Sequence, residues 1–159
     1  MKKINKILIT GAAGLCGSIL YDGLIKKGYK IICCDKKITP SNAAKKIKLK
    51  VNNKIKKIDL KNFKSLVKIT KGIDAAIHFG GIPRHTPKED IYSKILENNI
   101  SGTYNFFEEC RINKVKRIIF ASSAHVIGFH NRKNRIDEKC TLRPDSHYAV
   151  SKCFGEALA

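Results

Sequence analysis

The stretch that decides the fold of this chain is KILITGAAGLCG, residues 6–17. An apolar run at Lys6–Thr10 leads into a glycine-rich turn. The next segment, Leu15–Lys27, has its apolar residues at helical spacing and is closed by Gly28. The stretch therefore predicts a strand, a tight turn and a helix in direct succession.

Each glycine of this turn has a physical purpose in a nucleotide-binding unit. Gly11 permits the tight turn, Gly14 lets the backbone approach a pyrophosphate, and Gly17 allows the helix to pack closely. Leu15 and Cys16 open the helix, whose N–H groups and dipole favour an anion. We therefore predict that these five residues bind the phosphates of a dinucleotide.

Further short apolar runs alternate with helical patterns, as in repeated βαβ units. The predicted strands beyond the first are Lys30–Cys34, Lys54–Ile58, Ala75–Phe79 and Arg117–Ala121. Helices are expected at Asn62–Ile69, at Lys88–Asn113 and from near Pro144 onward, with a loop at residues 36–53. The fold class is α/β, a Rossmann-type doubly wound parallel sheet of about five strands. The last helix has no stop signal before Ala159, so residues 1–159 are expected to be a Rossmann domain that is incomplete at its C-terminus.

Composition limits the kind of protein. The chain has 159 residues, 43% of them hydrophobic, and a formal net charge of +19. The charge comes without a nucleic-acid recognition motif, so no specific nucleic-acid partner is expected. No apolar run is long enough to span a membrane, and the six cysteines show no zinc or disulfide spacing. We expect a cytoplasmic protein with free thiols and no metal site.

Acidic residues follow the second and third predicted strands. Asp35 can accept hydrogen bonds from ribose hydroxyls and repel a 2′-phosphate, which favours NAD over NADP. Lys36 and Lys37 weaken this preference because they could neutralise a phosphate. Asp59, followed by Leu60, is placed either to reach the adenine or to cap the helix at Asn62–Ile69.

The fourth strand ends in His78, Phe79, Gly80 and Gly81. The small Gly80-Gly81 pair would let backbone lie against a cofactor, because ligands of such sheets bind at the carboxyl ends of the strands. For His78 we predict a hydrogen-bonded interior position rather than a ligand.

Catalytic groups are predicted downstream of the fifth strand. Tyr148 and Lys152 are four residues apart on a helix and therefore share one face. The ammonium would stabilise the phenolate, which makes Tyr148 a candidate general base for a sugar hydroxyl. Ser123, at the end of the fifth strand, completes the set.

Together these motifs resemble an extended short-chain dehydrogenase/reductase of the NAD-dependent epimerase/dehydratase group. The segments at residues 78–82, 120–128 and 143–156 are similar to those of uronate dehydrogenases in that group. This resemblance implies oxidation at C1 of a uronic acid to an aldarolactone, with NAD as the hydride acceptor. It covers only the N-terminal part of such proteins.

The resemblance also implies residue roles. Tyr148 would be the base and would also contact the cofactor. Lys152 would tune the base and hold the nicotinamide ribose, and Ser123 would hydrogen-bond the reacting oxygen. His125 matches a substrate-side histidine, and Asn99 a helix asparagine near the cofactor.

Several points stay open at this stage. Ala124 stands where the family usually has a substrate-binding asparagine, and Pro83 where it has a serine, so the sugar acid could differ. A nucleotide-sugar epimerase or dehydratase, or an NAD-binding remnant without catalysis, would share the same motifs. Whether a chain of this length is active, and whether it forms a homo-oligomer through its long helices, is open too.

Overall fold

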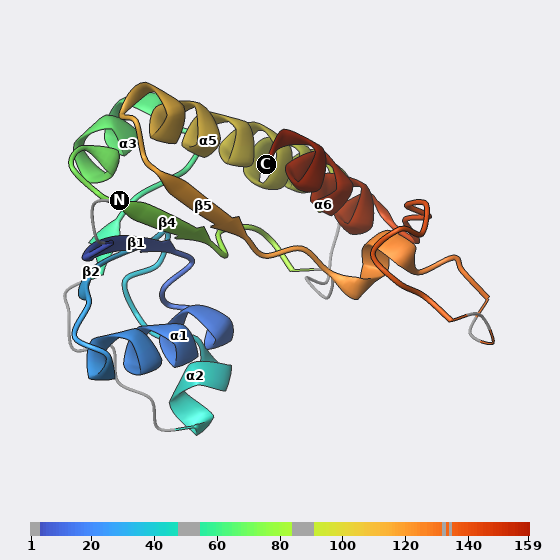
Figure 1. The fold of residues 1–159 in the computed structure, drawn as a ribbon, viewed down its shortest axis with the longest axis horizontal. Coiled ribbons are helices and arrows are strands. Elements are labelled where there is room, and N and C mark those ends of the chain that lie inside the picture. The colour runs from blue at the N-terminus through green and yellow to red at the C-terminus, as the bar shows by residue number, and fades with distance from the viewer. Residues whose placement is uncertain (1–3, 48–54, 84–90, 132, 134) are drawn as a thin grey trace.

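The computed structural model describes residues 4–47, 55–83, 91–131, 133 and 135–159. Within these residues, five parallel strands form one sheet in the order β3-β2-β1-β4-β5 (Figure 1). Their bounds are β1 Lys6–Thr10, β2 Lys30–Asp35, β3 Lys56–Lys57, β4 Ala75–His78 and β5 Arg117–Phe120. The predicted doubly wound parallel sheet is confirmed. Lys54, part of the predicted third strand, lies outside the described residues.

Helices cover both faces of the sheet (Figure 1). On one face lie α1 (Leu15–Lys26) and α2 (Asn42–Lys46). On the other lie α3 (Phe63–Thr70), α5 (Gly102–Ile112) and α6 (His147–Leu158). A short helix, α4 (Ile91–Ile95), and a π-helical turn, η1 (Leu96–Ser101), lead into α5. A 3₁₀ helix, η2 (Ala124–Ile127), follows β5.

The alternation of side chains along β1 divides the interior into two cores. Ile7 and Ile9 point toward α1, where they pack in one buried cluster with Tyr21. Leu8 points to the opposite face and packs in a second cluster with Phe106 of α5. Apolar residues on both faces are typical of a strand in the middle of a parallel sheet.

The segment at residues 36–53, predicted as a loop, contains the helix α2. The hydroxyl of Ser41 caps it by accepting a hydrogen bond from the N–H of Ala44 at 3.2 Å. The loop prediction is therefore wrong at residues 42–46, because the serine acts as an N-cap rather than as a turn residue. Residues 48–53 lie outside the described ranges.

The long helix predicted at Lys88–Asn113 is confirmed from Ile91 to Ile112, where α4, η1 and α5 follow one another without a gap. Residues 88–90 lie outside the described ranges, and the described part contains the π-helical turn η1 between α4 and α5. The last helix starts at His147 rather than near Pro144, because the Ser146 hydroxyl caps it by accepting the N–H of Ala149 at 3.2 Å.

Strand β5 lies at an edge of the described sheet, beyond β4. Its Ile119 side chain is 52% exposed, although it belongs to an apolar strand. Among the described residues no helix has the length and apolar character needed to cross a membrane. All six cysteines are free thiols, as predicted.

Candidate active site

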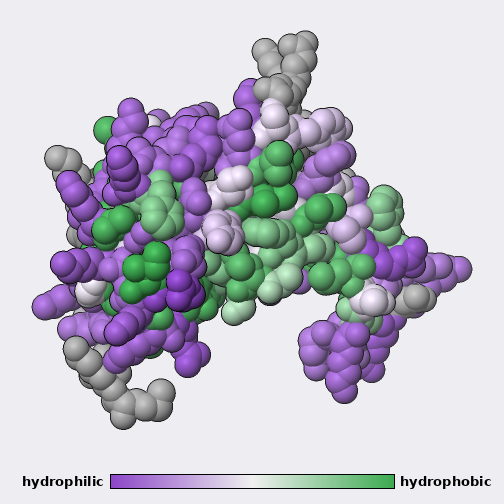
Figure 2. All heavy atoms as spheres, turned by 90° about the horizontal axis from the view of Figure 1, so that it is seen from above, coloured by the Kyte–Doolittle hydropathy of each residue, from purple (hydrophilic) through white to green (hydrophobic). Residues whose placement is uncertain are grey.

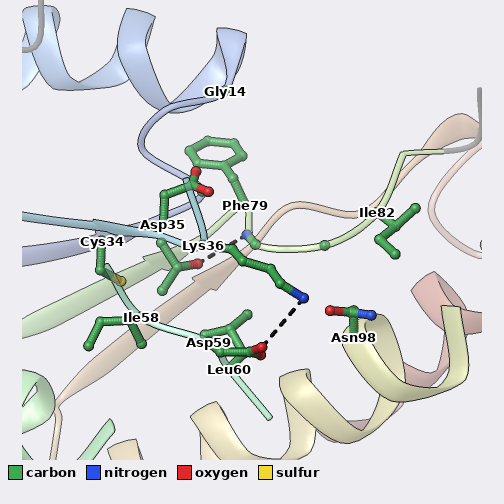
Figure 3. A pocket seen from close by; sticks show the side chains of 14 residues that line it. Gly14, Cys34, Asp35, Lys36, Ile58, Asp59, Leu60, Phe79, Ile82 and Asn98 are labelled. Carbon is green, nitrogen blue, oxygen red and sulfur yellow. Dashed lines mark hydrogen bonds and ion pairs between the residues drawn. The ribbon is translucent and has the colours of Figure 1, made fainter. Parts of the chain in front are cut away.

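A pocket opens at the carboxyl ends of the strands, between β1 and β4, where the strand order reverses (Figure 3). Ligands of doubly wound sheets bind at this kind of switch point. The pocket is lined by Thr10, Gly11, Gly14, Cys34, Asp35, Lys36, Ile58, Asp59, Leu60, Phe79, Gly80, Gly81, Ile82 and Asn98.

The glycine turn has the geometry that its sequence predicts. Gly11 has a φ of +67°, and a Cβ there would lie 2.8 Å from the carbonyl carbon of Phe79. Gly14 is the N-cap of α1 and has no side chain between the helix terminus and the pocket. A Cβ on Gly17 would lie 2.8 Å from Cα of Ala12, so this glycine packs against the turn itself. The backbone is thus exposed to the pocket where a pyrophosphate would need it.

His78 lies in the interior, as predicted, and is fully buried. Its Nδ1 lies 2.7 Å from Oγ1 of Thr10, and its Nε2 lies 3.1 Å from Oγ1 of Thr103. Thr10 Oγ1 also accepts the N–H of Gly80 at 3.0 Å. Burial, together with the charge of Lys152, lowers the pKa of His78 to about 3. A neutral histidine therefore holds the end of β4 against the end of β1.

Asp35 is fixed at the end of β2 by two backbone N–H groups. Its Oδ2 accepts the N–H of Ala13 and its Oδ1 the N–H of Lys37, both at 3.0 Å. Carboxylate oxygens have further acceptor capacity. The carboxylate is thus oriented beside the glycine turn, in the lining of the pocket.

Lys36 reaches across the pocket toward Asp59 and Asn98 (Figure 3). Its Nζ lies 3.4 Å from Oδ2 of Asp59. Partial burial raises the pKa of Asp59, but the Lys61 N–H and the charge of Lys36 outweigh it and lower that pKa below its ordinary value. Asn62, not Asp59, caps α3, so the helix-cap alternative for Asp59 is wrong.

The predicted catalytic groups gather beside β5. Lys152 is buried, its Nζ donates to the carbonyl of Ala121 at 2.8 Å, and it lies 5.6 Å from the ring centroid of Tyr148. Burial lowers the pKa of Lys152 to about 8. Ser123 is the N-cap of η2, and its Oγ accepts the N–H of His125 at 3.3 Å. The shared face of Tyr148 and Lys152 is therefore confirmed.

Asn99 connects the two parts of the site. Its Oδ1 accepts the N–H of Ile82 at 2.7 Å, and its Nδ2 donates to the Ile82 carbonyl at 3.0 Å and to Ser151 Oγ at 3.2 Å. The asparagine thus ties the end of the pocket to α6. Contact between Asn99 and a cofactor stays a prediction.

The structure divides the predicted cofactor residues. Nine of them line the pocket: Gly11, Gly14, Asp35, Lys36, Asp59, Leu60, Phe79, Gly80 and Gly81. Leu15, Cys16, Gly17, Asn99, Tyr148 and Lys152 lie outside its lining. Sequence reasoning missed Thr10, Cys34, Ile58, Ile82 and Asn98 as lining residues. Each of them directly adjoins a predicted residue, so the strand ends and, for Asn98, the neighbouring Asn99 could have indicated them.

No group of three or more His, Cys, Asp or Glu side chains is placed to hold a metal ion in the described ranges.

The strand order, the glycine turn and the Tyr148–Lys152 pair define a Rossmann fold of the short-chain dehydrogenase/reductase type. Residues 7–159 match the NAD dependent epimerase/dehydratase family. The chain belongs to this family.

Named relatives are similar over nearly the whole chain. A uronate dehydrogenase of Pseudomonas putida is 39% identical over 98% of this chain and 54% of its own length. A variant of uronate dehydrogenase from Agrobacterium tumefaciens, complexed with NAD, is 32% identical with a TM-score of 0.82 over 99% of this chain and 55% of that one. UDP-glucuronic acid 4-epimerase from Bacillus cereus, in complex with NAD, is 29% identical with a TM-score of 0.78 over 96% of this chain and 50% of that one. The chain spans about half the length of these relatives.

Proposed function

We propose that this chain is the NAD-binding part of an oxidoreductase that oxidises a uronic acid at C1 to an aldarolactone. The observation that carries the proposal is the buried Lys152 ammonium beside the Tyr148 ring, next to a glycine-lined nucleotide pocket. The similarity to uronate dehydrogenases supports the sugar acid as substrate.

The residues present fit NAD. The Gly11 turn and the uncapped start of α1 leave backbone donors for a pyrophosphate, and Asp35 is oriented for a ribose. NAD, when bound, supplies the acceptor for the hydride that leaves the sugar carbon.

The chain's own residues would handle the proton. Tyr148 removes the proton from the C1 hydroxyl, with the Lys152 ammonium 5.6 Å from the centroid of its ring. The Ala121 carbonyl holds the lysine in place, and Ser123, two residues beyond it at the start of η2, hydrogen-bonds the reacting oxygen.

The experiment is a calorimetric titration of the chain with NAD, ADP-ribose and NADP. We expect NAD and ADP-ribose to bind with similar affinity and NADP at least tenfold more weakly, because Asp35 repels a 2′-phosphate. Equal affinity for NADP would show that Asp35 does not have this role. No binding of any of the three would overturn the cofactor assignment.

A nucleotide-sugar epimerase or dehydratase is the second candidate, and the similarity to a UDP-glucuronic acid 4-epimerase favours it. To distinguish the two candidates, we would join residues 1–159 to the remainder of the P. putida uronate dehydrogenase. This chimera is then assayed with free uronate and with UDP-sugars. NADH formation from free uronate supports the dehydrogenase. In these assays, UDP-sugar conversion without net NADH would support the epimerase.

We also propose a homo-oligomer that pairs the faces of α5 and α6. Apolar side chains gather on this face (Figure 2). Exposed apolar residues of these helices and of η1 are Leu96, Tyr104, Ile112, Val150 and Leu158. Sedimentation of the chain and of Val150→Lys tests this: we expect an oligomer that the substitution dissociates.

A cytoplasmic location is part of the proposal, and the six free thiols support it. The proposal includes no nucleic-acid or membrane partner, because the high positive charge comes without a recognition motif.

A further inference from the structure

A carboxylate and an imidazole form a close pair, and the imidazole lies beside the proposed catalytic tyrosine. Oδ2 of Asp145 lies 2.8 Å from Nδ1 of His125. Both side chains are largely shielded from solvent: 15% of the Asp145 side chain and 30% of the His125 side chain are exposed. Oδ1 of Asp145 accepts the hydroxyl hydrogen of Ser146 at 2.9 Å. The pair joins η2 to the start of α6.

Backbone contacts fix the position of Asp145. The N–H of Arg143 donates to the carbonyl of Val126 at 2.8 Å, and the N–H of Asp145 donates to the carbonyl of His125 at 3.3 Å. Gly128 leaves the room that the carboxylate occupies, because a Cβ there would overlap with it. Asp145 is thus built into the site by the fold.

The partner decides where the His125 proton lies. A carboxylate can only accept, so Nδ1 of His125 must be the donor in this hydrogen bond. In the neutral ring, Nε2 is then a hydrogen-bond acceptor. His130 has the opposite arrangement, because its Nε2 lies 2.8 Å from the carbonyl oxygen of Thr141, which also only accepts.

The His125 ring lies beside the proposed base. Its centroid is 6.2 Å from that of Tyr148, with an angle of 79° between the planes. Ser123, which caps η2, is two residues away. As an acceptor at this place, Nε2 of His125 can receive a hydrogen bond from a sugar hydroxyl. It cannot receive one from a carboxylate, because a carboxylate has no hydrogen to donate.

We propose that Asp145 is a positioning residue of the uronate site: it holds His125 in the Nδ1-protonated form, so that Nε2 accepts a hydrogen bond from a second hydroxyl of the sugar. This inference rests on the proposed function for its substrate. The effect of Asp145 on His125 does not depend on that function.

The first test reads the tautomers directly, by long-range ¹H–¹⁵N NMR of the chain with ¹⁵N-labelled histidine rings, at a pH where the spectra no longer change. We expect Nδ1–H for His125 and Nε2–H for His130. In Asp145→Asn, the amide oxygen should keep the hydrogen bond from the Ser146 hydroxyl, which places the amide N–H₂ opposite Nδ1. His125 should then change to Nε2–H, because the amide donates to Nδ1. The exposed Asp137 provides a matched control, Asp137→Asn, which should leave His125 unchanged. An Nε2–H tautomer in the unmodified chain, or no change in Asp145→Asn, would overturn the proposal.

The second test measures kinetics in the chimera. Asp145→Asn should raise KM for uronate about tenfold, the loss of roughly one good hydrogen bond. Both kcat and NAD affinity should stay within about twofold. A fall in kcat at constant KM would show that Asp145 acts on the chemistry instead. A chimera that binds NAD but oxidises no uronate would overturn the proposed function and, with it, the proposed hydrogen bond between Nε2 of His125 and a sugar hydroxyl. The NMR result would still decide whether Asp145 fixes the tautomer of His125.

Discussion

Two buried basic side chains set the electrostatics of the site at the scale of single residues. His78 is neutral because burial and the nearby Lys152 charge lower its pKa to about 3. Lys152 keeps most of its charge at pH 7, since its pKa is lowered only to about 8. Of these two side chains, only Lys152 is therefore positively charged near Tyr148 at pH 7.

Tyr148→Phe removes the hydroxyl and keeps the ring. In the chimera we expect kcat for uronate oxidation to fall by about 10²–10⁴, which is the usual contribution of a general base. NAD affinity should be nearly unchanged, because Tyr148 lies outside the pocket lining. Tyr104→Phe, on the exposed face of α5, is the control and should retain full activity. Equal kcat values for Tyr148→Phe and Tyr104→Phe would show that Tyr148 is not the general base.

The lowered pKa of His78 makes a prediction about acid stability. Between about pH 6.5, where an unfolded histidine titrates, and about pH 3, only the unfolded chain binds this proton. The free energy of unfolding should therefore fall by about 1.4 kcal/mol per pH unit, or about 2 kcal/mol by pH 5, from this group. Lys152 adds no slope there, because its shifted range lies above pH 8.

Urea unfolding at pH 7 and pH 5 measures this contribution. Between pH 7 and pH 5, the free energy of unfolding of His78→Gln should decrease by about 2 kcal/mol less than that of the unmodified chain. The control is His130→Gln, whose histidine Nε2 lies 2.8 Å from the exposed carbonyl oxygen of Thr141, and it should keep the full pH dependence. Parallel pH dependence in His78→Gln would show that the histidine is not held neutral.

The first helix and its turn offer a comparison at the scale of the element. Gly11 has a left-handed backbone and no room for a Cβ, whereas a Cβ on Gly23, within α1, would meet no atom within 4 Å. Gly11→Ala should therefore reduce the free energy of unfolding by about 2 kcal/mol or more and weaken NAD binding at least tenfold. Gly23→Ala should raise stability by about 0.5–1 kcal/mol, because alanine favours a helix.

Thermal unfolding and NAD titration of both variants check this pair. Equal effects of the two substitutions would mean that the turn tolerates a side chain. Loss of NAD affinity in Gly23→Ala would mean that α1 contributes to binding beyond its first turn.

At the scale of the whole molecule, the pocket and the catalytic groups are separate regions joined through Asn99. The chain also spans about half the length of its uronate dehydrogenase relatives. We expect residues 1–159 alone to bind NAD without measurable uronate-dependent NADH formation. Correct positioning of the reacting groups can lower the activation barrier by about 7–11 kcal/mol. A site that encloses the substrate on only one side loses much of this reduction.

An absorbance assay at 340 nm on the purified chain, beside the chimera, tests this expectation. The chimera should form NADH. Robust turnover by residues 1–159 would contradict it and would indicate a partner subunit or a smaller substrate.

The sequence by itself determined the strand–turn–helix unit at residues 6–17, the parallel α/β fold and the common face of Tyr148 and Lys152. These features follow from local rules: apolar periodicity, the conformational needs of glycine and the geometry of one helical turn. Such rules act between near neighbours in the chain. They can therefore be read before any tertiary contact is known.

Only the tertiary structure decided the π-helical turn that carries Asn98 and Asn99, the Lys36–Asp59 ion pair and the Asp145–His125 hydrogen bond. The ion pair and the hydrogen bond each join side chains from different segments, and Asn99 of the turn bonds Ile82 and Ser151 outside it. Asp145 and His125 are 20 residues apart, and nothing in the spacing of an acid and a histidine indicates their contact. Packing of η2 against the start of α6 brings them together, and this packing depends on the whole fold.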